Sequence, residues 1–284
     1  MTQVVPAIPT PFYDDGVLDL PAFDAALQVI EPHVDAVFVA GTTGEFLALD
    51  DDERIELFRR AVAYLGRDRV IAHVGHGSSR QVLRLAKAAT AGGVHRFGLV
   101  SPYYIATDDD ALVGFYRTVA EAHPDASLYA YLFPERTGTD LSAETFGRLM
   151  DLPGMAGAKL SGGAADRLAE YADVMHDEQD LFSGDDARLP QAVGHGAAGL
   201  VSAVASAFPE SYRALADALD AEDSSAVEEH QAVAAHLVSA VGTTERVKAA
   251  LAERTGHDWA ARMALPALED EAREEVARAV AEHS

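Results

Sequence analysis

Short apolar runs alternate with stretches of helical periodicity along the chain as far as Ser202. Eight of these runs have the length of buried strands, at residues 4–8, 36–40, 70–74, 96–100, 128–131, 155–159, 181–183 and 199–202. Amphipathic stretches follow most of them and predict helices over about residues 21–30, 51–65, 79–91, 110–122, 143–150, 165–176 and 187–194.

Strands that are separated by helical crossovers pair in parallel, and their connections are right-handed. Eight such units in succession predict that the sheet closes into a (β/α)8 barrel, the TIM barrel of the α/β class. An open, doubly wound sheet is the alternative. The first unit lacks the GxGxxG sequence that opens many sheets of that kind.

Strand patterns stop near Phe208, and only helical patterns follow, over about residues 209–221, 224–241, 244–252 and 269–281. We therefore expect a barrel over residues 1–207 and a C-terminal helical extension over residues 208–284. The extension is too small for a second catalytic domain, and we expect it to pack on the barrel or on another subunit.

Composition narrows the class of protein. Apolar residues make up 49% of the 284 positions, enough for the core of one large domain. No apolar run reaches the length of about 18 residues that a membrane span needs, and the N-terminus does not resemble a signal peptide. The chain contains no cysteine, which excludes disulfides and cysteine nucleophiles and fits a cytoplasmic protein.

The charge is strongly acidic, with 46 Asp and Glu residues against 22 Lys and Arg residues and a net charge of −24. Solubility alone explains such a surface. A second hypothesis is halophilic adaptation to a high-salt cytoplasm, where acidic side chains stay hydrated and salt screens their repulsion. In both cases nucleic acids and anionic membranes are poor partners, since both bind basic surfaces.

Enzymes with (β/α)8 barrels build their active sites at the C-terminal ends of the strands. Lys159 ends the apolar sixth strand and is one of only three lysines, with Lys87 and Lys248. Burial of an ammonium ion is costly unless it is paired or loses its proton, and a neutral amine is the nucleophile of Schiff-base chemistry. The alternative is a lysine just past the strand that extends into solvent.

Two side chains at and after the end of the fifth strand are further candidates. The hydroxyl of Tyr131 can relay a proton or donate to a substrate oxygen, although most tyrosines at strand ends serve packing. Arg136 can hold a carboxylate with both arms of its guanidinium, although loop arginines more often form surface ion pairs.

The turn Gly41–Glu45, with the sequence GTTGE, follows the second strand and offers backbone N–H groups and two hydroxyls to an anion. It is not a P-loop, because no Gly-Lys-Ser/Thr ends it. His73 and His76 lie near the third strand end without a third ligand at a recognisable spacing, so we expect no metal site.

Two acidic segments predict helix starts. Asp108–Asp110 precedes the helix expected from residue 110. Gly184–Asp186 follows the seventh strand and either lines the site or caps the next helix, and we favour capping.

Together these motifs resemble the pyruvate-dependent class I aldolases and synthases, a family that includes dihydrodipicolinate synthase, N-acetylneuraminate lyase and 2-keto-3-deoxygluconate aldolase. Motifs in the same order cover nearly the whole chain: Pro9–Phe12, Gly41–Glu45, Ser101–Tyr104, Tyr131 with Pro134 and Thr137–Gly138, Lys159, and Ser183–Asp186. Several motifs in order are far more specific than any one of them.

The resemblance implies a covalent mechanism on pyruvate and an aldehyde, without a metal or other cofactor. It implies that Lys159 attacks the pyruvate carbonyl and that Tyr131 relays protons beside it. Thr42 and Thr43 match the pair that joins this relay and holds the pyruvate carboxylate. Tyr104 matches a tyrosine that reaches into a neighbouring subunit's site, which implies a homotetramer. We also expect substrate contacts from Gly41, Arg136, Gly184 and Val201.

The individual activity is harder to assign. Dihydrodipicolinate synthases usually have Asn where this chain has Leu132, and Glu where it has Leu160, whereas Arg136 and Ser183–Asp186 are similar to the synthases. Residues 38–44 and the tail at 265–273 are more similar to archaeal 2-keto-3-deoxygluconate aldolases.

We therefore expect reversible cleavage of 2-keto-3-deoxygluconate, or a related sugar acid, to pyruvate and glyceraldehyde. The alternatives are a 4-hydroxy-tetrahydrodipicolinate synthase, which condenses pyruvate with aspartate semialdehyde, and a 2-keto-3-deoxy sugar acid dehydratase. A barrel that only binds a 2-oxo acid as a sensor is the non-enzymatic alternative.

Overall fold

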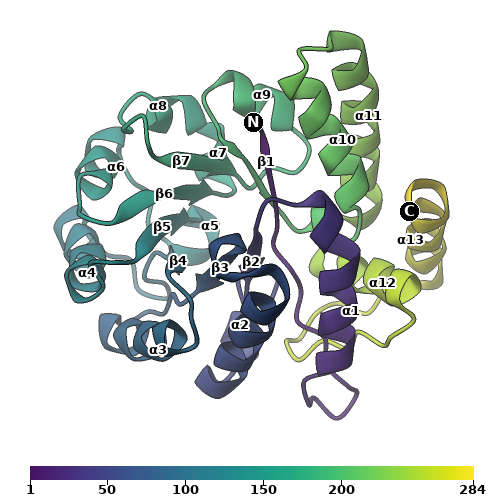
Figure 1. The fold of residues 1–284 in the computed structure, drawn as a ribbon, viewed down its shortest axis with the longest axis horizontal. Helices are drawn as coiled ribbons and strands as arrows, with labels where there is room; N and C mark the ends of the chain where they lie inside the picture. The colour runs from purple at the N-terminus through teal and green to yellow at the C-terminus, as the bar shows by residue number, and fades with distance from the viewer.

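The computed structural model describes residues 1–284 and centres on eight parallel strands, drawn as arrows in Figure 1. They are β1 (Gln3–Pro6), β2 (Val37–Val39), β3 (Val70–His73), β4 (Arg96–Val100), β5 (Ser127–Leu132), β6 (Met155–Leu160), β7 (Asp180–Ser183) and β8 (Gly199–Ser202). They pair in the order β1-β8-β7-β6-β5-β4-β3-β2, and a parallel bridge between Ala7 and Phe38 closes the ring. The predicted (β/α)8 barrel is confirmed, and the open sheet is wrong.

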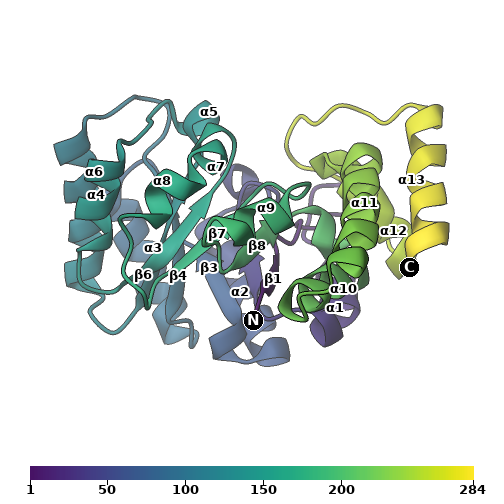
Figure 2. The same ribbon diagram turned by 90° about the horizontal axis from the view of Figure 1, so that it is seen from above.

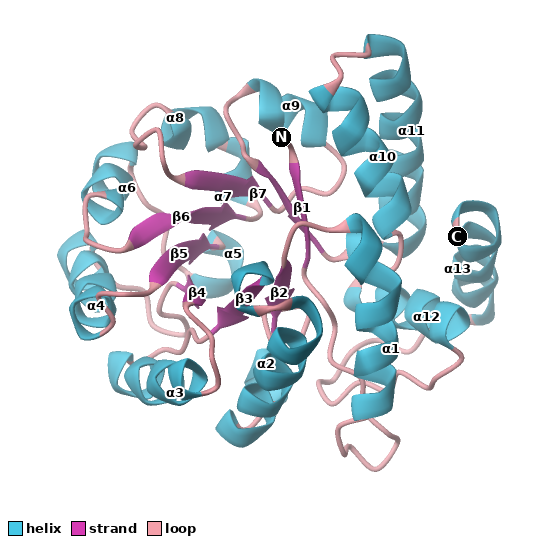
Figure 3. Ribbon diagram, viewed as in Figure 1, coloured by secondary structure: helices cyan, strands magenta, loops and turns pink.

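Helices surround this barrel, as Figure 3 shows in cyan. They are α1 (Leu20–Ile30), α2 (Asp51–Leu65), α3 (Ser79–Ala91), α4 (Asp109–Ala122), α5 (Pro134–Thr137), α6 (Ala143–Met150), α7 (Gly163–Asp166), α8 (Leu168–Ala172), α9 (Leu189–Gly194), α10 (Pro209–Asp220), α11 (Ser224–Val241), α12 (Thr244–Thr255) and α13 (Asp270–His283). Most of the predicted ranges agree with these to within a few residues.

Two helix predictions need correction. The helix expected over residues 165–176 is interrupted, because the backbone at Arg167 (φ −101°, ψ 14°) leaves helical geometry between α7 and α8. The short α5 was not expected. It begins at Pro134, whose fixed φ suits the first helical position, and it ends at Gly138 in the left-handed region.

The acidic segments behave differently from one another. Asp108 caps α4, as predicted, by accepting a hydrogen bond from the N–H of Ala111. The prediction that Gly184–Asp186 caps the next helix is wrong, because α9 starts later, with Arg188 at the capping position. Asp185 accepts a hydrogen bond from the N–H two residues on instead, and Asp186 accepts one from the N–H of Val204.

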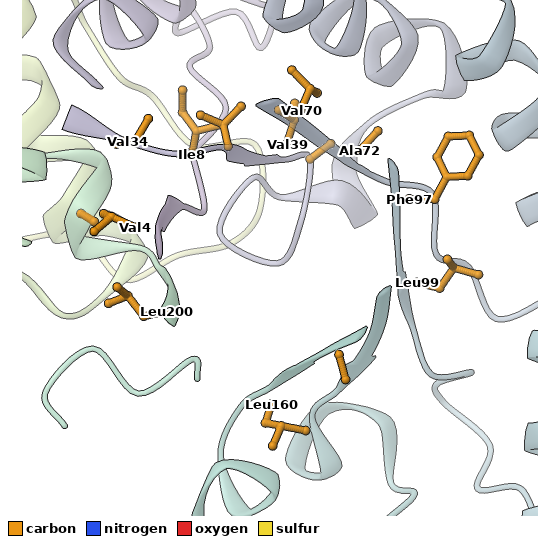
Figure 4. Packing of buried hydrophobic residues seen from close by; sticks show 14 of the residues in the cluster. Val4, Ile8, Val34, Val39, Val70, Ala72, Phe97, Leu99, Leu160 and Leu200 are labelled. Atoms are coloured by element: carbon orange, nitrogen blue, oxygen red, sulfur yellow. The ribbon is translucent and has the colours of Figure 1, made fainter. Parts of the chain in front are cut away.

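Side chains of the strands divide between two apolar clusters, because successive residues of a strand point to opposite faces. The larger cluster packs the outward faces against the helices, and Figure 4 shows members such as Val4, Phe97, Leu99 and Leu200. The smaller cluster fills the barrel and consists of Val5, Ala7, Ala36, Phe38, Phe46, Ile71, Val100, Tyr129, Tyr131, Phe182 and Val201. The interior is therefore a packed core, as in other barrels of this type.

The helices after β8 gather on one side of the barrel, with α13 outermost (Figure 2). α10 packs against β1 and α11, α12 packs against α1, and α13 packs against α11 and α12. Because α10 completes the eighth strand–helix unit, we propose that the extension begins after α10 rather than at residue 208. None of the helices combines the length and the apolar character that crossing a membrane requires.

Candidate active site

Lys159 lies inside the barrel near the C-terminal end of β6. Its neighbours Ala158 and Leu160 belong to the outer cluster, so the alternation of the strand turns Lys159 inward. The residue is 7% exposed, and its Nζ is 4.4 Å from the ring centroid of Tyr131 and 5.0 Å from that of Phe38. The alternative of a lysine that extends into solvent is therefore wrong.

Tyr131 is the register partner of Lys159 across β5 and β6. The tyrosine is 2% exposed, and its hydroxyl lies 3.2 Å from Oγ1 of Thr42, at a distance at which either oxygen can donate. The amine of Lys159, the phenol of Tyr131 and the hydroxyl of Thr42 thus lie next to one another in a largely buried site. Such an arrangement can pass a proton between a reacting group and the protein.

The turn Gly41–Glu45 that carries Thr42 and Thr43 is tightly folded. Ala40 before it and Glu45 at its end both have φ of 54°, in the left-handed region. At Gly44 an added Cβ would lie 2.9 Å from Cα of Ala40, so only glycine permits this approach.

Two residues that sequence reasoning did not select hold the start of this turn. His73 is fully buried; its Nδ1 lies 2.9 Å from the carbonyl oxygen of Ala40, and its Nε2 accepts a hydrogen bond from the N–H of Val100 at 3.3 Å. The buried Arg54 donates to the carbonyl oxygen of His73. The sequence does signal His73, as a polar residue in an otherwise apolar strand, whereas nothing local marks Arg54 on the charged α2.

Burial shifts the pKa values of both groups. It holds the pKa of His73 well below 6.5, and the charges of Arg54 and Lys159 lower this pKa further, against the hydrogen bond to Ala40. Burial also lowers the pKa of Arg54 to about 10, although nearby Asp51 and Tyr103 act in the opposite direction. His73 is therefore a neutral, hydrogen-bonded part of the barrel interior.

The other expected contact residues, Gly184 and Val201, lie just after β7 and on β8. Gly184 donates its N–H to the carbonyl oxygen of Leu160 at 2.6 Å, and an added Cβ there would lie 2.3 Å from Oγ of Ser161. Val201 belongs to the interior cluster. Burial raises the pKa of Asp186 to about 6, while a hydrogen bond from the Val204 N–H and the charge of Lys159 lower it.

Arg136 and Tyr104 lie outside this group. Arg136 on α5 is exposed, and its Cζ lies 5.6 Å from the ring centroid of Phe133, which is 6.2 Å from the ring of Tyr131. Tyr104 is 96% exposed with φ of 78°, and the neighbouring Ile105 is 73% exposed. Within one chain, Tyr104 is therefore not brought to Lys159.

Comparison with known proteins supports this picture. The family model described as the dihydrodipicolinate synthetase family matches residues 1–283. A 4-hydroxy-tetrahydrodipicolinate synthase of Xanthomonas campestris is 36% identical over 220 residues, which cover 76% of this chain and 72% of that protein. An uncharacterized DapA-like lyase of Halobacterium salinarum is 37% identical over 222 residues, 78% of this chain and 72% of that protein.

Solved structures agree as well. The dihydrodipicolinate synthase of Acinetobacter baumannii, solved in complex with pyruvate, superimposes with a TM-score of 0.91 at 28% identity, covering 99% of this chain and 98% of that one. The relatives from Xanthomonas campestris and Acinetobacter baumannii bear the name of the synthase that was the alternative above, rather than that of the sugar-acid aldolase. The chain belongs to the dihydrodipicolinate synthetase family and is a Schiff-base-forming carbon–carbon lyase of the pyruvate-dependent aldolase and synthase type, an enzyme rather than a sensor.

Proposed function

We propose that this enzyme condenses pyruvate with a short aldehyde that carries a carboxylate, as a 4-hydroxy-tetrahydrodipicolinate synthase does with aspartate semialdehyde. One observation supports the chemistry above all others. The buried Nζ of Lys159 lies against the ring of Tyr131, whose hydroxyl is within hydrogen-bonding distance of Thr42. The names of the relatives support the choice of aldehyde.

In the proposed reaction the neutral amine of Lys159 adds to the C2 carbonyl of pyruvate. Loss of water from that adduct leaves a Schiff base, whose protonated nitrogen accepts electrons when C3 loses a proton. The resulting enamine carbon attacks the aldehyde, and water then releases the product and restores the amine. Tyr131 and Thr42 carry the protons between these steps.

Two features suit the carboxylates of the two substrates. The hydroxyls and backbone N–H groups of Thr42 and Thr43, after Gly41, are proposed to hold the pyruvate carboxylate between Gly184 and Val201. Arg136 is proposed to hold the carboxylate of the aldehyde, because its guanidinium stacks on Phe133 and stays free for a bidentate contact.

Cleavage of a 2-keto-3-deoxy sugar acid is the second candidate, and the loop after β7 favours it. Burial raises the pKa of Asp186 to about 6 and the nearby Lys159 opposes this rise, and a carboxylate at this place can accept hydrogen bonds from the hydroxyls of a sugar chain. Leu132 and Leu160, where synthases usually have Asn and Glu, also depart from the pattern of the synthases. A sugar-acid dehydratase would share the first step.

Trapping with borohydride tests the covalent step. In the presence of pyruvate, reduction should add one pyruvate-derived group to the peptide that contains Lys159. The exposed Lys87 serves as the control within the same molecule, and Lys159→Met should abolish the adduct. An adduct on Lys87 alone, or none on Lys159, would show that the proposed nucleophile is wrong.

A substrate comparison then separates the two candidates. We would measure consumption of aspartate semialdehyde with pyruvate beside release of pyruvate from 2-keto-3-deoxygluconate. For the synthase, Arg136→Ala should raise the KM for the semialdehyde at least tenfold with a smaller effect on pyruvate trapping, because only the aldehyde carboxylate loses its partner. Turnover of the sugar acid alone, unchanged in that variant, would establish the aldolase instead.

A further inference from the structure

A buried ion pair joins the end of the threonine turn to the C-terminal extension. The side chain of Glu45 is 1% exposed, and that of Lys248 on α12, its partner, is 3% exposed. Nζ of Lys248 also donates to the carbonyl oxygen of Ala260 at 2.8 Å and lies 5.0 Å from the ring centroid of Phe12. Each charge would be strongly unfavourable at this depth without the other.

All hydrogen-bond donors to the Glu45 carboxylate come from the extension. Lys248 donates to Oε1, and the backbone N–H groups of Arg262 and Met263 donate to Oε2 at 2.9 and 2.6 Å. The side chain of Arg262 adds a contact to the residues after the turn, because its Nη1 donates to the carbonyl oxygen of Ala48 at 2.7 Å. Lys248 on α12 and the loop that follows this helix thus both bind the segment just after the threonines.

The turn needs such support, because its backbone is strained. Ala40 and Glu45 are non-glycine residues in the left-handed region, a conformation that persists only where the surroundings impose it. His73 holds the carbonyl oxygen of Ala40, and Thr10 donates to the carbonyl oxygen of Gly44 at 2.7 Å. Glu45 is held in the same way, by the ion pair with Lys248 and by the backbone N–H groups of Arg262 and Met263.

We propose that Glu45 and Lys248 are positioning residues, which hold Thr42 and Thr43 against Lys159 and Tyr131 and so make the C-terminal extension part of the active-site architecture. The N–H of Glu45 donates to the carbonyl oxygen of Thr42 at 3.0 Å, so a displacement of Glu45 moves Thr42 directly. The kinetic part of this inference rests on the proposed binding of pyruvate by the threonines.

The main test uses Lys248→Met, which removes the charge and keeps most of the side-chain volume. Its matched control is Arg254→Met, also on α12, which breaks an ion pair with Glu210 on α10 that does not touch the turn. Both variants lose one ion pair of the extension. If Lys248→Met does not fold, the neutral pair in Glu45→Gln with Lys248→Met replaces it, because neither charge is then left alone.

Two measurements separate positioning from simple stabilisation. Hydrogen exchange of the peptide amides at residues 41–48 reports the turn without reference to any substrate. The rate of borohydride trapping at increasing pyruvate concentration gives a half-saturating concentration, which a smaller folded fraction would leave unchanged. The full-length protein is used throughout.

We expect Lys248→Met to accelerate exchange at residues 41–48 at least tenfold and to raise the half-saturating pyruvate concentration at least tenfold, with Arg254→Met close to the wild type in both. Unchanged exchange in a folded Lys248→Met or double variant overturns the inference, as does an unchanged pyruvate dependence. Absence of an adduct in the wild type contradicts the proposed function instead, and the exchange data still decide whether Lys248 holds the turn.

Discussion

Two of the three lysines are buried, and their surroundings give them different chemistry. The ammonium of Lys248 is held by a carboxylate and a carbonyl oxygen, and its ion pair with Glu45 opposes the burial that lowers the pKa of Lys248. Nζ of Lys159 meets the faces of two aromatic rings instead of a carboxylate, and such rings hold a cation more weakly than a buried ion pair does. The contrast explains why only one of these amines is proposed as a nucleophile.

The phenol beside Lys159 provides the first prediction. Tyr131→Phe keeps the ring against Nζ of Lys159 but removes the hydrogen bond to Thr42, so the rate of Schiff-base formation with saturating pyruvate should fall by about 100-fold or more. Rapid quenching with borohydride measures this rate. Tyr129→Phe is the control, because that hydroxyl bonds Arg96 at 2.8 Å rather than Thr42. Equal rates in the Tyr131 variant and the wild type would exclude the relay.

The buried His73 predicts how stability depends on pH. Its pKa is held well below 6.5 in the folded protein, so the unfolded chain takes up a proton there that the folded chain refuses. The free energy of unfolding should therefore fall as the pH is lowered below about 6.5, with a contribution from His73 of up to about 1.4 kcal/mol per pH unit. This contribution ends at the lower pKa of the folded state.

Denaturant unfolding of the wild type and of His73→Leu between pH 7 and pH 5 measures this contribution as the difference between the two curves. The subtraction is needed because burial also lowers the pKa values of His76, His95 and His123. The variant should be less stable at pH 7, since Ala40 loses its donor, yet it should lose less stability on acidification. His236→Leu, at an exposed position, is the control. Parallel curves would mean that His73 accepts the proton in both states.

At the scale of elements, the conformation and the exposed side chains of the loop after β4 would be energetically unfavourable in an isolated subunit. It exposes Tyr104 with a left-handed backbone and Ile105 beside it, a strained and apolar combination that is typical of a contact surface. We propose that this loop meets a second copy of the chain and that Tyr104 completes the neighbour's site.

Ile105→Asp tests this proposal. The side chain is exposed, so folding of the subunit should be unaffected, but the charge should separate the assembly because it would be buried without a partner. Light scattering should show a multiple of the subunit mass for the wild type and a single subunit for the variant. Tyr64→Asp, at a partly exposed site on α2, should leave the assembly intact. A wild-type protein with the mass of one subunit would contradict the proposed assembly.

The strands were predictable because each is a short apolar run between amphipathic helices, and this pattern depends on local sequence alone. Lys159 was predictable for the same reason, since the alternation of β6 fixes its direction. The break at Arg167 and the lack of a cap at Asp185 depend instead on contacts with distant segments, such as the bond from Arg167 to the carbonyl oxygen of Leu141.

The role of Lys248 was hidden for a similar reason. Lysine is rare in this chain, which singles out Lys248 as clearly as Lys159. Its partner Glu45, however, lies 203 residues earlier in the chain, and no local pattern links the two. Arg54 was missed because an arginine on a charged amphipathic helix normally faces water, whereas this one turns inward to the carbonyl oxygen of His73. Roles that depend on a pairing between distant segments require the fold.

At the scale of the whole molecule, the acidic charge lies almost entirely on the surface. Of the 46 acidic residues only Asp19 and Glu45 are buried almost completely, and Asp186 is partly buried. Asp19 caps α1, and Glu45 is paired with Lys248. The exposed carboxylates, which give the net charge of −24, therefore repel one another across the surface. This favours unfolding at low ionic strength, since an expanded chain separates like charges.

Halophilic adaptation predicts that salt relieves this repulsion. The midpoint of thermal unfolding should rise with KCl, most steeply below about 1 M, because the screening length falls from about 10 Å at 0.1 M to about 3 Å at 1 M. Substitution of Glu271, Glu274 and Glu282 on α13 by glutamine should raise the midpoint at low salt and flatten its rise, because these exposed carboxylates contribute repulsion without ion pairs. If the acidic surface serves solubility alone, the midpoint should stay constant across the KCl series in both proteins while precipitation changes, and that result would exclude adaptation of the fold to high salt.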